Sequence, residues 1–207
     1  MTSFYDRHIM PRLISCACAG PSIMKQRAKV VPLASGRVLE LGIGGGLNLA
    51  FYDPARVSEV IGVDPSAALR TRAEAAPHAE GLKVSIREGA AEALPFEPAS
   101  FDDVVCTFTL CTVHSPGAAL AEARRVLKPG GRLLFCEHGL APDAGVAKWQ
   151  RRIEPVWKAI AGGCHLTRAV LPTLQAAGFK VAAPQSMYLP GAPRIAGWNE
   201  WGTAVAA

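Results

Sequence analysis

Two short segments of this chain place reactive side chains next to one another. Glu137 and His138 end the apolar run FCEHG, and Cys164 and His165 follow two glycines in GGCHLTR. An imidazole titrates near neutral pH and a cysteine is nucleophilic as its thiolate, so such pairs can move protons, attack an electrophile or bind a metal. No metal site is predicted, because Cys164 and His165 lack further ligands at a suitable spacing.

A third segment, VLELGIGGG, has the residues of a ligand-binding turn. Gly42, Gly44 and Gly46 follow an apolar run, and Asp64 ends the next run, EVIGVD. Glycine lets the chain turn sharply and lets a ligand approach the backbone. A carboxylate only accepts hydrogen bonds and can take both hydroxyls of a ribose. The pattern predicts an adenosine-containing ligand, but it fits nicotinamide cofactors and S-adenosylmethionine equally.

Short apolar runs alternate with helical stretches from residue 37 onward, which is typical of parallel strands joined by helices. The sequence predicts an α/β protein with a Rossmann-like, doubly wound, seven-stranded and mostly parallel sheet, helices on both faces and an N-terminal helical lid. Expected strands are 37–42, 59–64, 83–89, 101–110, 132–138, 179–189 and 201–206. Expected helices run from the glycine turn to about residue 52 and over 65–76, 116–127, 142–161 and 166–179.

The 207 residues fit one domain of ordinary size. We expect a lid over residues 1–36, a cofactor-binding core over 37–138, an acceptor-side insertion over 139–178 and C-terminal strands over 179–207.

The net charge of +5 is concentrated near the N-terminus, where residues 1–37 hold six basic side chains against one acidic one. Without interleaved aromatic residues, a solvated helix face is favoured over a nucleic-acid partner. Peripheral contact with an anionic membrane stays open.

There is no apolar run of the ~20 residues that a membrane helix needs and no secretory signal, so the prediction is a cytoplasmic protein. The six scattered cysteines are expected to be free thiols.

Three features separate the two cofactor classes. Glu40 precedes the first glycine, Leu47 stands where the third dinucleotide glycine belongs, and GAAEALPF (89–96) follows the third expected strand. With RVLKPGG (125–131), these resemble the class I S-adenosylmethionine-dependent methyltransferases that act on small molecules.

The resemblance implies where S-adenosylmethionine binds. The glycines lie against the methionine moiety, Asp64 takes the ribose and Pro65 packs on the adenine. Many relatives carry Asp at the position of Ala90, so Glu92 or a backbone carbonyl must replace that acceptor here. The implied cofactor residues are Tyr5, Glu40, Gly42, Ile43, Gly44, Gly46, Asn48, Asp64, Pro65, Ala91, Glu92 and Thr107.

The segments TLCTV (109–113), FCEHG (135–139), WQRRIEPVW (149–157) and GGCHLTR (162–168) are more specific. They resemble the methyltransferase-like thiol S-methyltransferases and their bacterial relatives. This implies methyl transfer to a small apolar thiol by direct in-line displacement, leaving S-adenosylhomocysteine.

The acceptor site is expected beyond the fourth and fifth strands. His138 is the preferred base or thiolate partner, with Glu137 orienting its ring; a purely structural His138 is an equal alternative. Cys164 is interpreted as a wall or gate of the pocket. The remaining expected substrate contacts are Cys111, His114, Trp149 and His165.

Other acceptors remain open: a lipid amine, a quinone or a metalloid. The spacing of Cys16 and Cys18 does not favour a metalloid, since two residues apart on a helix they face different directions. A non-catalytic adenosine-binding protein is a further alternative. Either a monomer or a homodimer is compatible with the sequence.

Overall fold

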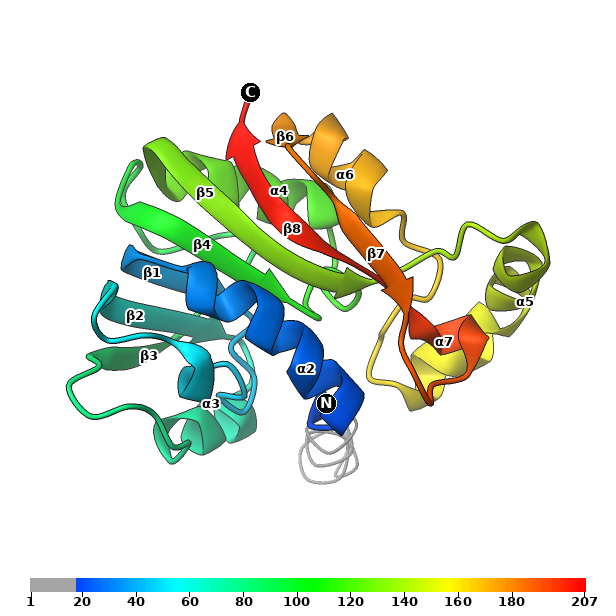
Figure 1. Ribbon diagram of the computed structural model, residues 1–207, viewed down its shortest axis with the longest axis horizontal. Helices are drawn as coiled ribbons and strands as arrows, with labels where there is room; N and C mark the ends of the chain where they lie inside the picture. The colour runs from blue at the N-terminus through cyan, green and yellow to red at the C-terminus, as the bar shows by residue number, and fades with distance from the viewer. Residues whose placement is uncertain (1–17) are drawn as a thin grey trace.

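The computed structural model describes residues 18–207 and contains one mixed sheet (Figure 1). Seven strands follow one another in the order β3-β2-β1-β4-β5-β8-β6, and β7 adds another strand by pairing with β8. The first five are mutually parallel, whereas β8 is antiparallel to its neighbours. The strands are β1 Gly36–Leu41, β2 Val57–Asp64, β3 Val84–Glu88, β4 Phe101–Thr107, β5 Leu127–His138, β6 Phe179–Val181, β7 Gln185–Tyr188 and β8 Trp198–Ala206. The predicted doubly wound, mostly parallel α/β fold is confirmed.

The central strands are apolar on both sides because helices cover both faces of the sheet. Helices α2 (Pro21–Val30) and α3 (Ala67–Glu74) pack on one face, and α4 (Pro116–Val126) and α6 (Val170–Ala176) on the other. Successive side chains of a strand point to opposite faces. On β5, for example, Phe135 enters the core under α4 and α6, and Cys136 enters the core under α2 and α3.

Local signals in the sequence fix two of these helices. Ser66 and Ser115 are N-cap residues whose hydroxyls accept from Leu69 N (3.4 Å) and Ala118 N (3.3 Å). Such caps satisfy backbone donors that have no partner inside the helix. They begin α3 directly after β2 and α4 directly after the loop that follows β4.

The glycine turn does not lead into an α-helix. Turns and a short 3-10 helix, η3 (Leu49–Phe51), fill the connection, since Gly42, Gly44 and Gly46 all have positive φ angles that interrupt helical geometry. A second 3-10 helix, η2 (Val31–Leu33), follows α2.

The C-terminal third also differs from the prediction in its bounds. Residues 179–189 form two short strands, β6 and β7, and β8 begins at Trp198. Helix α6 starts only at Val170. In the loop before it, Leu166 N donates to Glu154 and the Arg168 guanidinium donates to Val113 O, so this segment is not part of the helix. In the expected insertion, α5 (Ala144–Ile160) extends away from the sheet, with α7 (Arg194–Gly197) beside it (Figure 1).

Part of the expected lid lies outside the described residues, including Tyr5 and Cys16. Its described part is α2, which crosses the sheet face and reaches the β7–α7 loop (residues 189–193), where Ser22 Oγ donates to Pro190 O at 2.8 Å. Between residues 18 and 207, no helix combines the length and apolarity that crossing a bilayer requires.

Candidate active site

The first pocket opens at the carboxyl ends of β1, β2 and β4, where the strand order reverses. It is a cavity of about 370 Å³ lined by the glycine loop (residues 42–47), Asp64, residues 89–92 and the β4–α4 loop (residues 108–115). Ligands of open parallel sheets bind at this position. We call it the cofactor pocket.

Each glycine of the loop meets a different requirement. A Cβ on Gly42, at φ +62°, would lie 2.6 Å from Thr109, and one on Gly46 would lie 2.7 Å from Ala76 Cβ. Gly44 has φ +56° and no such neighbour, the nearest atom being 3.8 Å away. Gly42 and Gly46 therefore allow close packing, and Gly44 leaves its backbone open to the pocket.

Asp64 holds the loop from the end of β2. Its carboxylate accepts from Gly44 N at 3.0 Å and from Ser66 N at 2.8 Å, and the side chain lines the pocket. Burial raises the pKa of Asp64, although the two backbone donors oppose that shift. A carboxylate has about four acceptor positions. Asp64 can therefore bind further hydroxyl donors in the pocket.

Glu40 supports the loop from beneath rather than from the pocket wall. It is buried and accepts from Asn48 Nδ2 at 2.9 Å and Tyr52 OH at 2.7 Å. Burial raises the pKa of Glu40 to about 7 despite these donors. Asn48 is equally buried, so both residues act on the shape of the loop.

Arg27 of α2 was not predicted as a site residue, and the solvated face expected for the basic N-terminal segment is wrong at this position. The guanidinium is buried, donates to Asn48 Oδ1 (2.9 Å) and Thr107 Oγ1 (2.6 Å), and lies 5.0 Å from the Phe108 ring centroid. It lines the cofactor pocket, as Thr107 does. The distribution of charge in the N-terminal segment could not predict the burial of Arg27, because the burial of one basic residue depends on how α2 packs on the sheet.

The opposite wall contains the residues expected at the adenine. Pro65, Ala91 and Glu92 all line the pocket. Glu92 Oε1 accepts from the backbone N of His114 (2.7 Å) and of Ser115 (3.2 Å), so Glu92 fixes the start of α4. His114 reaches this pocket and not the acceptor side.

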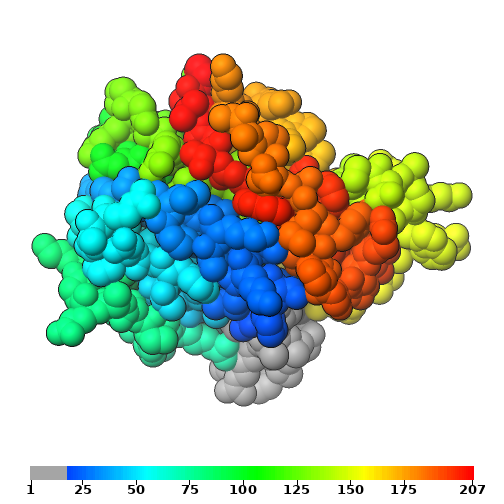
Figure 2. Space-filling model, viewed as in Figure 1, coloured from blue at the N-terminus to red at the C-terminus, as the bar shows by residue number. Residues whose placement is uncertain are grey.

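A second, larger cavity of about 630 Å³ adjoins the first. We call it the acceptor cavity. It is lined by the start of α2, the β4–α4 loop, the end of α5 and the β7–α7 loop, and its wall is mostly apolar. Figure 2 shows α2 and the segment around residue 190 side by side on one face of the molecule. Cys18, Phe108 and Thr112 line both cavities and form their common boundary.

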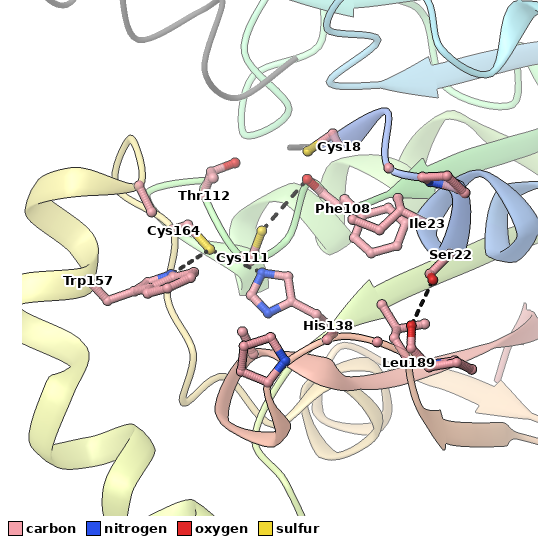
Figure 3. A pocket seen from close by; sticks show the side chains of 18 of the residues that line it. Cys18, Ser22, Ile23, Phe108, Cys111, Thr112, His138, Trp157, Cys164 and Leu189 are labelled. Carbon is pink, nitrogen blue, oxygen red and sulfur yellow. Dashed lines mark hydrogen bonds between the residues drawn. The ribbon is translucent and has the colours of Figure 1, made fainter. Parts of the chain in front are cut away.

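Three reactive side chains meet on the wall of the acceptor cavity (Figure 3). The ligand-type atoms of Cys111, His138 and Cys164 all lie within 4.8 Å of one another. We call these residues the sulfur–imidazole cluster. His138 Nε2 is 3.1 Å from Cys164 Sγ, and Trp157 Nε1 donates to the same sulfur at 3.4 Å.

The cluster changes the acidity of its members. Hydrogen bonding from Cys111 and His138 lowers the pKa of Cys164 to about 4, although burial opposes that shift. The same contact with Cys164, together with burial, raises the pKa of Cys111 well above its ordinary value. Burial by itself would lower the pKa of His138, but the neighbouring Cys164 raises it overall. Both shifts act in the same sense: they favour the thiolate form of Cys164 and the protonated form of His138.

Glu137 lies on the other face of β5, and we find no hydrogen bond between it and the His138 ring in the described structure. Its Oε1 accepts from Thr109 N at 2.8 Å and Leu110 N at 3.1 Å. Burial raises the pKa of Glu137. Neighbouring residues of a strand point to opposite faces, which is why Glu137 holds the β4–α4 loop instead of orienting the imidazole.

Two further expected substrate contacts lie elsewhere. Trp149 is 56% exposed and lies near Arg152, outside the acceptor cavity. His165 Nδ1 pairs with Glu154 Oε1 at 2.8 Å and joins α5 to the following loop. Trp157, which was not among the predicted substrate contacts, is the tryptophan that reaches the cavity.

Comparison with known proteins agrees with this geometry. Residues 39–135 match the methyltransferase domain family. The chain is 39% identical to thiol S-methyltransferase TMT1B of Rattus norvegicus, over 77% of this chain and 68% of that protein. It is also 39% identical to the Homo sapiens protein of the same name, over 79% of this chain and 71% of that one. Phosphatidylethanolamine N-methyltransferase of Cereibacter sphaeroides is 34% identical over 63% of this chain and 66% of that protein.

Solved structures share the fold at lower identity. An S-adenosylmethionine-dependent methyltransferase from Mesorhizobium loti superposes with a TM-score of 0.65 at 19% identity, over 90% of this chain and 98% of that one. The [4+2]-cyclase SpnF superposes with a TM-score of 0.68 at 21% identity, over 97% and 92%. The second shows that this fold by itself does not fix the reaction.

Fold, glycine loop and acidic strand end define an S-adenosylmethionine-dependent methyltransferase, and S-adenosylmethionine is its cofactor. More narrowly, the chain belongs to the methyltransferase family that includes the rat and human proteins named thiol S-methyltransferase.

Proposed function

We propose that this enzyme transfers the methyl group of S-adenosylmethionine to the sulfur of a small, mostly apolar thiol. The observation that carries the proposal is the acceptor cavity: it is apolar, adjoins the cofactor pocket across Phe108 and Thr112, and has the sulfur–imidazole cluster on its wall.

The cofactor half of the proposal follows the geometry of the glycine loop. The open backbone at Gly44 lies against the methionine moiety, and Asp64 accepts the ribose hydroxyls. Pro65 and Ala91 pack against the adenine. The sulfonium methyl then points across the shared boundary into the acceptor cavity.

The chemistry of the cavity wall favours sulfur over nitrogen or oxygen as the acceptor. Its ionisable side chains, within the described residues, are Cys18, Cys111, His138 and Cys164. No carboxylate of that part of the chain lines it, although a protonated amine needs a base to free its lone pair. A thiol loses its proton at a pKa of ~8.5 and needs only a modest positive group nearby.

Methyl transfer is then a direct displacement. The acceptor thiolate attacks the methyl carbon, the carbon–sulfonium bond breaks, and its electron pair returns to the sulfur of S-adenosylhomocysteine. The protein has to align the two sulfurs and limit the access of water, for which a mostly apolar cavity is suited.

The test is a competition among acceptors that share one carbon skeleton. Purified enzyme with methyl-labelled S-adenosylmethionine is given an apolar thiol and the amine and phenol of the same skeleton, and the labelled products are separated. We expect transfer to the thiol. Transfer to the amine or phenol but never to sulfur would reject the proposal. Asp64→Ala serves as the control for cofactor-dependent signal.

A further inference from the structure

We propose that the sulfur–imidazole cluster is a binding site for one thiophilic metal ion, with Zn²⁺ as the best-matched ion. Cys111 Sγ, Cys164 Sγ and His138 Nε2 would be the protein ligands, and the fourth position would face the acceptor cavity. The inference deepens the proposed function, on which its catalytic part rests.

The ligand set and its size fit zinc. Two cysteines and one histidine with an open fourth position form a known type of catalytic zinc site. For tetrahedral geometry with bonds of ~2.3 Å to sulfur and ~2.0–2.1 Å to nitrogen, ligand atoms stand about 3.5–3.8 Å apart. The three atoms here lie within 4.8 Å of one another, and His138 Nε2 is 3.1 Å from Cys164 Sγ. Small side-chain rotations would bring them to the required distances.

The backbone that carries the ligands is fixed by independent contacts. The loop of Cys111 is held by Glu137 through Leu110 N and by the guanidinium of Arg168, which donates to Leu110 O and to Val113 O. A backbone hydrogen bond from His165 N to Cys111 O, at 2.8 Å, joins the segment that carries Cys164 to that loop.

His138 is held separately, at the end of β5 and opposite Asn199 of β8. Three segments distant in sequence are therefore fastened to one another around the ligand atoms. Such support from the surrounding structure distinguishes a built site from a chance approach of side chains.

The charge of the site also matches its surroundings. A dication bound by two thiolates and a neutral imidazole has no net charge, which an apolar wall tolerates. Without a metal, a second thiolate there would be an unpaired buried charge. Trp157 Nε1, 3.4 Å from Cys164 Sγ, supplies the N–H donor that commonly supports a ligating sulfur.

The open position gives the site a role in the proposed reaction. An acceptor thiol that binds there loses its proton to solvent and becomes a metal-bound thiolate. Its sulfur then attacks the cofactor methyl, the carbon–sulfonium bond breaks, and the electron pair stays on S-adenosylhomocysteine. The product is a neutral thioether, a weaker ligand than a thiolate, so it leaves the metal.

The test measures metal binding without reference to activity. Protein stripped with a chelator is titrated with Co²⁺, whose thiolate ligands give a charge-transfer absorption, and Zn²⁺ is then used to displace it. We expect one ion per chain. Adding an apolar thiol without cofactor should change the cobalt spectrum, because it occupies the open position.

Variants separate this site from other cysteines. Cys111→Ser, Cys164→Ser and His138→Gln should each weaken Co²⁺ binding at least 100-fold, whereas Cys18→Ser, on the same cavity wall but outside the cluster, should retain it. Calorimetry with S-adenosylhomocysteine verifies that each variant is folded. The proposal is overturned if the unaltered protein does not bind Co²⁺, if Cys164→Ser binds it equally well, or if Cys18→Ser abolishes it.

The two proposals fail in different ways. If the protein binds the metal through the cluster but methylates only amines, the metal site is supported and the thiol acceptor is rejected. If the protein still methylates thiols at the full rate after a chelator has removed the metal, the proposed function is supported and the role of the metal is overturned.

Discussion

The cofactor pocket and the acceptor cavity share a boundary but are built in opposite ways. The cofactor pocket is lined mainly by short segments that follow the parallel strands β1, β2, β3 and β4, and the carboxylate of Asp64 holds the glycine loop. The acceptor cavity takes apolar side chains and sulfur atoms from segments between residues 18 and 196.

The difference has a chemical reason. The cofactor pocket must bind the same polar molecule in every relative, and a fixed turn with one carboxylate does this. The acceptor cavity must exclude water and present one reacting atom, which side chains from different elements can achieve. Changes in the first should therefore affect cofactor affinity, and changes in the second should affect the acceptor KM.

The largest effect is expected for Asp64→Ala. Two hydrogen bonds to a charged group contribute ~1.5–3 kcal/mol each, so affinity for S-adenosylmethionine should fall roughly 1,000-fold. Loss of the contact to Gly44 N also loosens the loop. Isothermal calorimetry measures this; an unchanged affinity would remove Asp64 from the cofactor site. Co²⁺ binding at the cluster should persist.

The next effect is a dependence of stability on pH that originates at Glu40. Because its pKa is about 7 in the folded protein, above the ordinary value of 4.5, the folded state holds the proton more tightly. The contribution is therefore complete below pH ~4.5 and is lost as the pH rises through about 7. It amounts to up to roughly 3 kcal/mol.

Urea unfolding at pH 5 and at pH 8 measures this loss, and Glu40→Gln, which resembles the protonated acid, should abolish it. An equal pH dependence in the variant would assign the effect to another group.

A matched pair of glycine substitutions compares packing with ligand access in the loop. Gly42→Ala puts a Cβ 2.6 Å from Thr109, whereas Gly44→Ala meets no atom closer than 3.8 Å, and both residues have positive φ. The strain of that conformation is thus common to both. We expect Gly42→Ala to lower the free energy of unfolding by about 2 kcal/mol more. Equal losses in urea unfolding would contradict the assigned roles.

The smallest effect should come from the acceptor cavity. Ile23→Ser removes apolar contact from its wall, so the KM for an apolar thiol should rise about tenfold, while S-adenosylmethionine affinity stays the same. Trp149→Ser, at an exposed position outside the cavity, is the control. Steady-state kinetics would contradict the picture if Trp149→Ser raised the KM and Ile23→Ser did not.

The sequence by itself determined the sheet, its helices and most of the cofactor pocket. These depend on local patterns: apolar runs of strand length, glycines at a turn, serine caps and an acid at a strand end. The errors of the prediction were local as well. It placed an α-helix after the glycine turn, where the structure has turns and a short 3-10 helix, and it divided the C-terminal strands wrongly.

Only the tertiary structure decided which side chains meet in the acceptor cavity. Cys111, His138 and Cys164 are separated by more than twenty residues along the chain, and Arg27 and Trp157 enter the two pockets from α2 and α5. Sequence periodicity gives the face of an element on which a residue lies, but not the element that faces it. Helix docking and strand pairing set that, so they selected Trp157 over Trp149 and His138 over His165 as partners of Cys164.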